Sequence, residues 1–225
     1  MGAPVPEVVV GTTIACSFIL FGNAITQSFM GVPALLVDFP PPSSPSHASR
    51  AQLLGRQWPT FWKVGNVFFR PISTLGIFGY GYTAYIVSSS ASASASASSP
   101  SSSSLGRLGG DWRLYALSAL CHLVTVVHSA VNMQPINEKL DALKYEKGEG
   151  EAAAAEEEEA EDDNDDEEGK KKKRKKKKKE GGRKAVDVDT RLAEEYARRW
   201  IRFNTVRLIT PVVAGTIALT QVLRR

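Results

Sequence analysis

The chain has 225 residues, a formal net charge of +4 and a mean hydropathy of −0.17. These averages conceal the tract over residues 147–184, where twelve acidic residues between Glu151 and Glu168 are followed by ten consecutive basic ones, Lys170–Lys179. Outside that tract the sequence is strongly apolar and has no run of basic residues interleaved with aromatics, which argues against a nucleic-acid-binding protein. Two cysteines, Cys16 and Cys121, lie in apolar segments, so they exclude a disulfide framework and offer no Cys/His metal spacing.

The first apolar segment runs from about Val8 to Met30, and no charged residue lies between Glu7 and Asp38. At about 1.5 Å per residue, a helix of this length crosses the hydrocarbon core of a bilayer, which is about 30 Å thick. The residues before it contain no Lys or Arg, and the apolar stretch is longer than that of a typical signal peptide. We therefore predict a retained first membrane span.

A Pro-rich irregular loop that ends in a short helix is predicted for residues 31–57. It leads to Trp58, Phe61 and Trp62, in an amphipathic stretch. Aromatic residues of this kind gather at the interface between lipid and water. We expect this stretch to lie at one surface of the membrane.

The second span is predicted over about 64–87, whose inner part has no charged residue from Pro71 onward. Gly76, Gly79 and Gly81 stand in it among aromatic residues. Small residues at such spacing let helix backbones approach closely in lipid. We therefore expect this helix to pack tightly against its neighbours.

The Ser/Ala tract at 88–104 is predicted to be a disordered, flexible linker. The third span follows, from about Trp112 to Met133, and Pro135 is expected to break its helix as it leaves the membrane. His122 lies inside this span, where a lone histidine on an apolar helix is typical of a structural hydrogen-bond partner.

Residues 147–184 cannot bury enough apolar surface to offset the entropy of ordering them, so they are predicted to form a disordered loop. Two interpretations of the basic block Lys170–Lys179 stay open: a weak contact with anionic lipid, or neutralisation by the neighbouring acidic block. After this loop, residues 191–199 look helical and lead into the fourth predicted span, over about 203–223.

These elements predict an all-α integral membrane protein, a single four-helix bundle with disordered low-complexity loops, whose surroundings are the lipid bilayer. Lys and Arg near the spans are more frequent on the side of the first and third loops. We therefore predict a multi-pass endomembrane protein with the long charged loop in the cytosol and both termini in the lumen. The basic residues on the loop side are Arg50, Arg56, Lys63, Lys139, Lys144, Arg198, Arg199 and Arg202, against Arg107, Arg113, Arg224 and Arg225 opposite.

A stripe of polar side chains lies at the entrance to the fourth span. At about 100° per residue, Trp200, Asn204 and Arg207 fall within roughly 40° of one another on a helix. Polar groups at the edge of hydrocarbon are costly unless they pair with each other, with water or with a ligand. Arg207 is either an interfacial anchor or the cation of a site, in which it holds an oxyanion while Asn204 orients the ligand and Trp200 stacks on it.

A second polar set lies at the end of the third span. His128 and Asn132 are one helical turn apart, and Asn137 follows in a Pro-x-Asn sequence. A neutral imidazole at His128 would be able to take a proton from a phenol or an acidic carbon near pH 7. The two sets together predict a shared site. Asn132 and Asn137 would contact the substrate.

A weaker stripe consists of Trp62, Asn66 and Arg70 at the start of the second span, and Trp62 and Asn66 are candidates for substrate contacts. In the first span Asn23 and Gln27 lie one turn apart, where the expected role is polar contact between helices.

The sequence has no motif for a metal or a nucleotide. It contains no HExxH, no Gly-rich phosphate loop, no GxGxxG after a strand and no GxSxG elbow. His122 and His128 are six residues apart and point about 120° away from one another on a helix. We expect neither a metal nor a cofactor.

Three segments and the four spans resemble the anthrone oxygenase family, a set of small multi-pass membrane proteins. The segments are W-P-T-F-W-K-V-G-N at 58–66, P-I-N-E-K-L at 135–140 and W-I-R-F-N-T-V-R at 200–207. The pattern Trp-x-x-x-Asn-x-x-Arg before the last span is the most specific of them. The resemblance covers the spans and their edges, and both low-complexity tracts look like insertions.

The resemblance implies oxidation of an anthrone, or a related phenolic polyketide of secondary metabolism, to a quinone by molecular oxygen without a recognised cofactor. His128 would then remove the acidic methylene proton, and Arg207 with Asn204 would stabilise the oxyanion. Trp200 and Trp62 would suit a flat aromatic substrate in the bilayer. The alternative is a non-enzymatic membrane scaffold or small-molecule carrier, in which the polar stripes only hold helices together.

Overall fold

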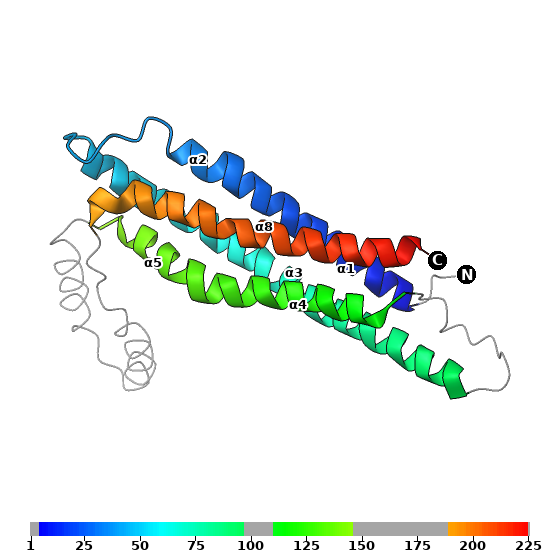
Figure 1. Ribbon diagram of the computed structural model, residues 1–225. Helices are drawn as coiled ribbons and strands as arrows, with labels where there is room; N and C mark the ends of the chain where they lie inside the picture. Colours follow the sequence, from blue (N-terminus) through cyan, green and yellow to red (C-terminus); the bar gives the residue numbers. More distant parts are fainter. Residues whose placement is uncertain (1–4, 97–109, 146–188, 225) are drawn as a thin grey trace, which may run out of the picture.

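The computed structural model describes residues 5–96, 110–145 and 189–224, and this part of the chain is helical apart from short turns. The helices form four long segments, which lie side by side and alternate in direction along the sequence (Figure 1). The first packs on the second and fourth, and the third packs on the same two. The segments are α1 (Val5–Thr26) with η1 (Gln27–Gly31) and α2 (Val32–Leu35); α3 (His47–Ser96); α4 (Trp112–His128) with η3 (Ser129–Met133) and α5 (Gln134–Ala142); and η4 (Thr190–Leu192) with α8 (Ala193–Leu223).

Three of the four segments are long and apolar enough to cross a membrane: Val5–Leu35, Trp112–Ala142 and Thr190–Leu223. The helix α3, which contains the predicted second span, does not meet the same criterion, because glycine and tyrosine lower its mean hydropathy. It nevertheless turns large apolar side chains outward, among them Phe78, which is 71% exposed, and Phe68. All four segments thus present an apolar exterior, which suits a helical bundle in lipid.

The first helix is longer than we predicted. It continues through a turn of π-helix and ends at Leu35, and α3 begins at His47, so the irregular connection covers only residues 36–46. The expected Pro-rich loop over 31–57 therefore begins later than predicted, and the short helix expected at its end is the first part of α3.

Pro135 does not break the third helix, contrary to our prediction. The chain stays helical through η3 and α5 to Ala142. Each of the two π-helical turns is followed by a proline, Pro33 after η1 and Pro135 after η3. A proline ring clashes with the carbonyl four residues earlier, and the wider π turn relieves that clash while the helix goes on.

The Ser/Ala tract is partly ordered. We predicted a flexible linker over 88–104, but α3 extends through Ser96. Alanine is the best helix former, and the hydroxyls of Ser90 and Ser92 bond to the carbonyls of Ile86 and Ser88 one turn earlier. The rest of that tract, and the predicted disordered loop over 147–184 with its basic block, lie outside the described residues.

The apolar core is divided into two clusters. The one at the α2 and α5 end consists of Val32, Ala51, Leu54, Trp58, Met133, Ile136, Leu140, Leu143, Ala193, Ala197 and Trp200. The one at the opposite end consists of Val10, Tyr80, Ala84, Val87, Tyr115, Ala214 and Ala218.

Buried hydrogen bonds join the helices beside the second cluster. Ser17 of α1 lies 2.9 Å from both the Tyr80 hydroxyl of α3 and Nε2 of His122 of α4. Gly76 makes room for this contact, since a Cβ there would come within 2.5 Å of Cε1 of His122. Hydrogen bonds of this kind stabilise the packing of membrane helices, because lipid supplies no hydrophobic driving force for their association.

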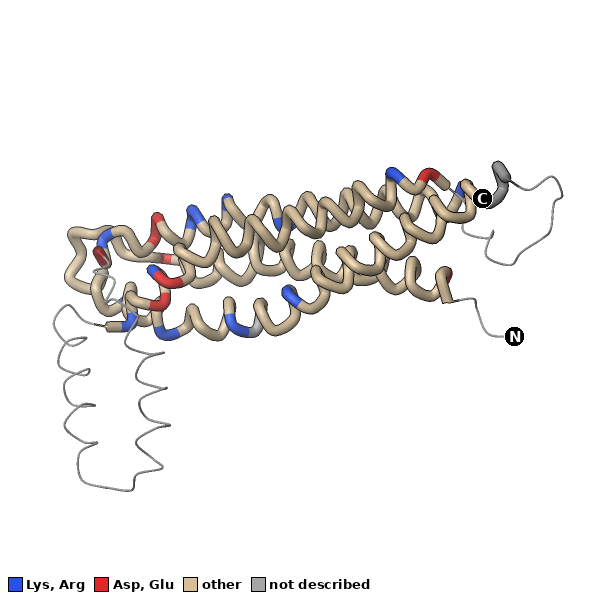
Figure 2. The backbone as a smooth tube through the Cα atoms, turned by 90° about the horizontal axis from the view of Figure 1, so that it is seen from below, with Lys and Arg blue, Asp and Glu red and all other residues tan. Residues whose placement is uncertain are grey.

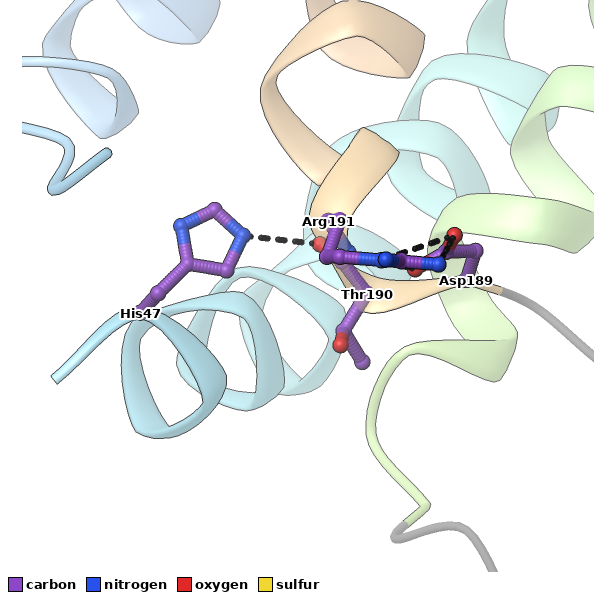
Figure 3. A network of polar contacts seen from close by, with 4 residues as sticks. All are labelled: His47, Asp189, Thr190 and Arg191. Atoms are coloured by element: carbon purple, nitrogen blue, oxygen red, sulfur yellow. Dashed lines mark hydrogen bonds and ion pairs between the residues drawn. The ribbon is translucent and has the colours of Figure 1, made fainter. Parts of the chain in front are cut away.

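A buried histidine ties the start of α3 to the start of the last segment (Figure 3). His47 directs Nε2 at the carbonyl oxygen of Thr190, 3.0 Å away, and Nδ1 at that of Pro40, 2.7 Å away. Beside it Arg191 forms an ion pair with Asp189. These contacts hold the N-terminal turn of α8 against the loop end of α3, and so fix where the polar stripe on α8 lies.

Candidate active site

Asn137 of α5 meets two tryptophans in the first core cluster. Its Oδ1 accepts hydrogen bonds from Nε1 of Trp200, at 2.9 Å, and from Nε1 of Trp58, at 3.3 Å. The two indole rings are edge to face, with centroids 5.4 Å apart. Two of the predicted site residues, Asn137 and Trp200, are therefore in direct contact. The indole N–H of Trp200 and the amide oxygen of Asn137 are used in the hydrogen bond between them.

Asn204 lies one turn further along α8 and is fully buried. Its Nδ2 donates to Oγ of Ser28, at 2.8 Å, and to the carbonyl oxygen of Ala24, at 3.2 Å. Its Oδ1 is buried and has no hydrogen-bond partner in the described part of the chain. Asn204 thus anchors α8 to the first helix with one half of its amide and leaves the other half unused.

Arg207 follows on the same face of α8 and is only 7% exposed. Its guanidinium carbon lies 3.9 Å from the ring centroid of Phe69 of α3, and its Nη1 donates to the sulfur of Met133 at 3.6 Å. Its Nε is buried without a partner, and no salt bridge joins Arg207 to a carboxylate among the described residues. A ring face and a thioether compensate a buried cation poorly, so this site favours an anion.

The residues around Arg207 come from all four segments. Both π-helical turns contribute, Ser28 from η1 through Asn204 and Met133 from η3 through Arg207 itself. Turns of π-helix are found disproportionately at functional sites. Gly65 brings α3 close, because a Cβ there would lie 3.3 Å from Nε2 of Gln27 and 3.7 Å from Cδ2 of Phe69.

We define the Arg207 cluster as Arg207 with the two side chains that contact it, Phe69 and Met133, and Asn204 one turn earlier on α8 with its partner Ser28. Two polar atoms of this cluster are buried without a hydrogen-bond partner in the described residues: the donor Arg207 Nε and the acceptor Asn204 Oδ1. Trp62 Nε1 of α3 and Gln27 Oε1 of η1 are also buried without such a partner.

His128 lies apart from the Arg207 cluster. Its Nε2 is 2.9 Å from the carbonyl oxygen of Phe203, which can only accept, so Nε2 carries the proton. Its Nδ1 is 3.0 Å from Nδ2 of the exposed Asn132, which donates to it. Both ring nitrogens are occupied by structural bonds, and no contact joins His128 to Arg207 within the described residues. The two predicted stripes do not converge at His128.

The three residues of the predicted stripe at the start of α3 also differ in their surroundings. The Trp62 indole nitrogen is buried without a hydrogen-bond partner in the described residues, Asn66 is half-buried, and Arg70 is exposed. The sequence identified Trp62 as a candidate but assigned Gln27 to helix contact and missed Ser28, Phe69 and Met133. The spacing of Trp62, Gly65 and Phe69 at i, i+3 and i+7, one face of a helix, is the signal that would have found Phe69.

No group of three or more His, Cys, Asp and Glu side chains gathers in the described residues in a way that could hold a metal ion. Two open grooves lie at the loop end instead. One, of about 590 Å³, runs along the first turns of α8 beside Arg198 and Arg202, and the other lies beside Asp38 and Arg50. The side chains of the Arg207 cluster are themselves buried.

Residues 58–217 match the family described as anthrone oxygenase. The chain belongs to the anthrone oxygenase family. The match begins at Trp58 and takes in most of α3, all of α4 and α5, and most of α8. It therefore includes Trp62 and, from the cluster, Phe69, Met133, Asn204 and Arg207. Gln27 and Ser28, on the first helix, precede it. Comparison with curated proteins and with solved structures gives no match.

Proposed function

We propose that the protein is a membrane oxygenase that converts an anthrone, or a related phenolic polyketide, to a quinone with molecular oxygen. Family membership supports this class of reaction. The single observation that carries the proposal is the buried, unpaired guanidinium of Arg207 beside the unused Oδ1 of Asn204. The substrate's ionised form supplies the negative charge that this site lacks.

The chemistry requires an anion. The central methylene of an anthrone is acidified by the ketone and the flanking rings, and loss of its proton places negative charge on the ketone oxygen. That electron-rich anion reduces oxygen directly. One atom of O₂ becomes the new ketone oxygen, and the other leaves as water with the two hydrogens of the methylene. Donors aimed at the developing oxyanion lower the barrier to the first step, and one such donor typically contributes about 10²–10³ in rate.

Proton removal is assigned to water rather than to His128. Both nitrogens of that imidazole are hydrogen-bonded, Nε2 to the carbonyl oxygen of Phe203 and Nδ1 to the side chain of Asn132. Neither of these partners contacts Arg207 through its side chain in the described residues. The reaction then depends on how strongly Arg207 favours the anion, which makes electrostatic stabilisation the main contribution of the protein. Arg207 keeps the oxyanion role that the sequence predicted. Asn204 does not share it, because its Nδ2 donates to Ser28 and Ala24 and its free Oδ1 can only accept a hydrogen bond.

A flat ring system would enter beside aromatic side chains. Phe69 covers one side of the Arg207 guanidinium, and the Trp62 and Trp200 rings pack on the adjoining core cluster. Because the cluster is buried, a substrate has to displace Phe69 and the flexible Met133 from Arg207. An apolar substrate dissolved in the bilayer would reach them between helices.

The proposed location is an endomembrane, with the long charged loop in the cytosol. Figure 2 shows Lys, Arg, Asp and Glu gathered at the end where α3 and α8 begin, and few charges over most of the opposite half. An excess of Lys and Arg on one side orients a multi-pass protein with that side in the cytosol. Membrane crossing by three of the segments is compatible with this arrangement.

Oxygen uptake by membranes that contain the protein, supplied with 1,8-dihydroxyanthrone, tests the proposal. We expect a protein-dependent rate above that of empty membranes, and its loss on Arg207→Met. The matched control is Arg202→Met, an exposed arginine five residues earlier on α8, which should keep the rate. A rate equal to the empty-membrane background, at an equal amount of inserted protein, would overturn the assignment to anthrones.

The second candidate function is a non-enzymatic scaffold or small-molecule carrier. It is favoured by the burial of the cluster and by the bonds through which Asn137 and Asn204 join helices. A carrier would bind an anthrone without consuming oxygen, and a scaffold would do neither.

A further inference from the structure

His47, at the start of α3, has hydrogen-bond partners that a neutral imidazole cannot satisfy. Its Nδ1 lies 2.7 Å from the carbonyl oxygen of Pro40, and its Nε2 lies 3.0 Å from that of Thr190 (Figure 3). A carbonyl oxygen only accepts, and a neutral imidazole has one N–H, so one of the two carbonyls would lack a donor. The imidazolium has an N–H at each nitrogen and donates to both.

The surroundings of His47 couple its proton to the contact between two segments. Pro40 belongs to the connection that precedes α3, and Thr190 begins the last segment. Only 4% of the His47 surface is exposed, so little water is available to replace a lost bond. Burial and the positive end of the α3 helix dipole both disfavour a charge on the ring. Two hydrogen bonds from a charged donor offset these costs only while both carbonyls stay in place.

We propose that His47, Pro40 and Thr190 form a pH-sensitive latch at the loop end of the bundle. When the imidazole is protonated, it donates to both carbonyls and holds the start of the last segment against the connection. When it loses the proton, one of the two bonds is lost and this contact opens more often. Histidine is the side chain whose charge ordinarily changes between about pH 5 and 8, so acidification closes the latch. This inference does not depend on the reaction assigned to Arg207.

Open grooves bring water close to the latch. One groove is lined by Pro40, whose carbonyl oxygen accepts from Nδ1, and by Ser46, next to His47 in the chain. The other is lined by Arg191, next to Thr190. Protons therefore have a short path to and from the buried ring.

The other charged groups near the latch titrate in different pH ranges. Arg50 donates to the carbonyl oxygen of Val37, and Arg191 forms an ion pair with Asp189. Carboxylates ordinarily titrate at about pH 4 and arginines above about pH 12. A change between pH 5.5 and 8 therefore reports on histidine. The charged groups on the connection, on the first turn of α3 and on η4 with its cap are Asp38, Arg50, Asp189 and Arg191.

Nitrogen-15 NMR of the full chain in lipid nanodiscs reads the protonation state directly. The chain has three histidines, so labelling histidine alone gives three imidazoles, and the signals missing in His47→Gln belong to His47. We expect the shifts of an imidazolium at pH 5.5 and those of a neutral ring at pH 8. A ring in the same state at both pH values would overturn the proposal. If His47→Gln does not insert, His122→Gln and His128→Gln assign the other two rings, and the wild-type titration decides alone.

Amide hydrogen exchange measures whether the latch opens. The reporter is the amide of Leu192, which donates to the carbonyl oxygen of Asp189 in the first turn of the last segment. After correction for the intrinsic effect of pH on exchange, its protection in wild type should fall about tenfold from pH 5.5 to pH 8, for the loss of one bond from a charged donor. His47→Gln should show equal protection at both pH values, since an amide side chain does not titrate.

Two matched controls isolate His47. His128→Gln replaces a histidine that bonds α4 to α8, and Asp189→Asn removes the carboxylate beside the latch. Both variants should keep the tenfold dependence on pH. The proposal is overturned if the dependence is absent in wild type, persists in His47→Gln or disappears in Asp189→Asn.

Discussion

The guanidinium of Arg207 of α8 lies over the ring of Phe69 of α3, with 3.9 Å between the guanidinium carbon and the ring centroid. The arginine is buried, and within the described residues its only hydrogen bond goes to the sulfur of Met133. A cation–π contact is worth up to about 2 kcal/mol when desolvated, whereas burying an unpaired charge costs several. The contact with Phe69 therefore does not compensate the cost of burying the Arg207 cation. Burial of that cation becomes favourable when an anion binds beside it.

Replacing Arg207 by lysine should abolish most activity although the positive charge remains. Lysine has no planar guanidinium that can stack on the Phe69 ring while its Nε–H donates a hydrogen bond to the substrate. Its ammonium group therefore cannot reproduce the geometry of the arginine. We expect kcat/KM for anthrone oxidation to fall about 100-fold, the usual effect of losing one oxyanion donor. Steady-state oxygen uptake measures it, with Arg202→Lys as the control. A Lys variant within threefold of wild type would mean that charge alone suffices.

His128 should be dispensable for turnover. Its Nε2 and Nδ1 are bonded to Phe203 and Asn132, so His128→Gln removes a link between α4 and α8 but no group that reaches substrate. We expect kcat within about threefold of wild type. A loss of 100-fold or more, with normal insertion, would restore His128 as the base.

Asn137 should matter for stability more than for chemistry. Asn137→Leu leaves the indole N–H groups of Trp58 and Trp200 buried without an acceptor. We expect a loss of about 2–6 kcal/mol in the free energy of unfolding, at about 1–3 kcal/mol for each of the two unpaired groups. The midpoint of thermal unfolding in detergent, followed by circular dichroism, reports it. Asn132→Leu, on an exposed side chain, should shift the midpoint little; equal shifts would contradict the role of Asn137.

Gly76 should not tolerate a side chain. A Cβ there would come within 2.6 Å of Cγ of His122, whose ring is held by Ser17 and enclosed on all sides. Gly76→Ala should therefore reduce the folded fraction, and removal of the ring in the double variant Gly76→Ala/His122→Ala should recover part of it. Gly81→Ala on the same helix meets nothing and should be neutral or stabilising by up to about 1 kcal/mol. A neutral Gly76→Ala would show that α3 and α4 are not packed as described.

The sequence predicts the helical class and the membrane segments because apolar length and period are local properties. It also identifies Trp200, Asn204 and Arg207 as one stripe, since spacing on a single helix fixes a shared face. It does not predict that Pro33 and Pro135 lie in continuing helices, because a π turn that absorbs a proline has no simple sequence signature. The helix over 88–96 was likewise unexpected, since its composition suits a linker as well.

Contacts between helices are the part that sequence patterns do not give. The spacing of His128 and Asn132 places them one turn apart, but nothing in it indicates that His128 also bonds to a backbone carbonyl on α8. Gln27 comes close to α3 because Gly65 leaves space for it. The first fact depends on how α4 packs on α8, and the second on how η1 packs on α3.

The most direct test is the ionisation of a bound anthrone in the absence of oxygen. Unsubstituted anthrone, which has no phenol to titrate, is mixed with purified protein under anaerobic conditions, and the absorbance of its anion is followed against pH. With wild-type protein the anion should form about one pH unit or more below the value in detergent alone, since a nearby cation lowers the pKa of an acid by about 1–3 units. Arg207→Met should remove that difference. An identical titration for wild type and Arg207→Met, with anthrone bound in both, would contradict the account.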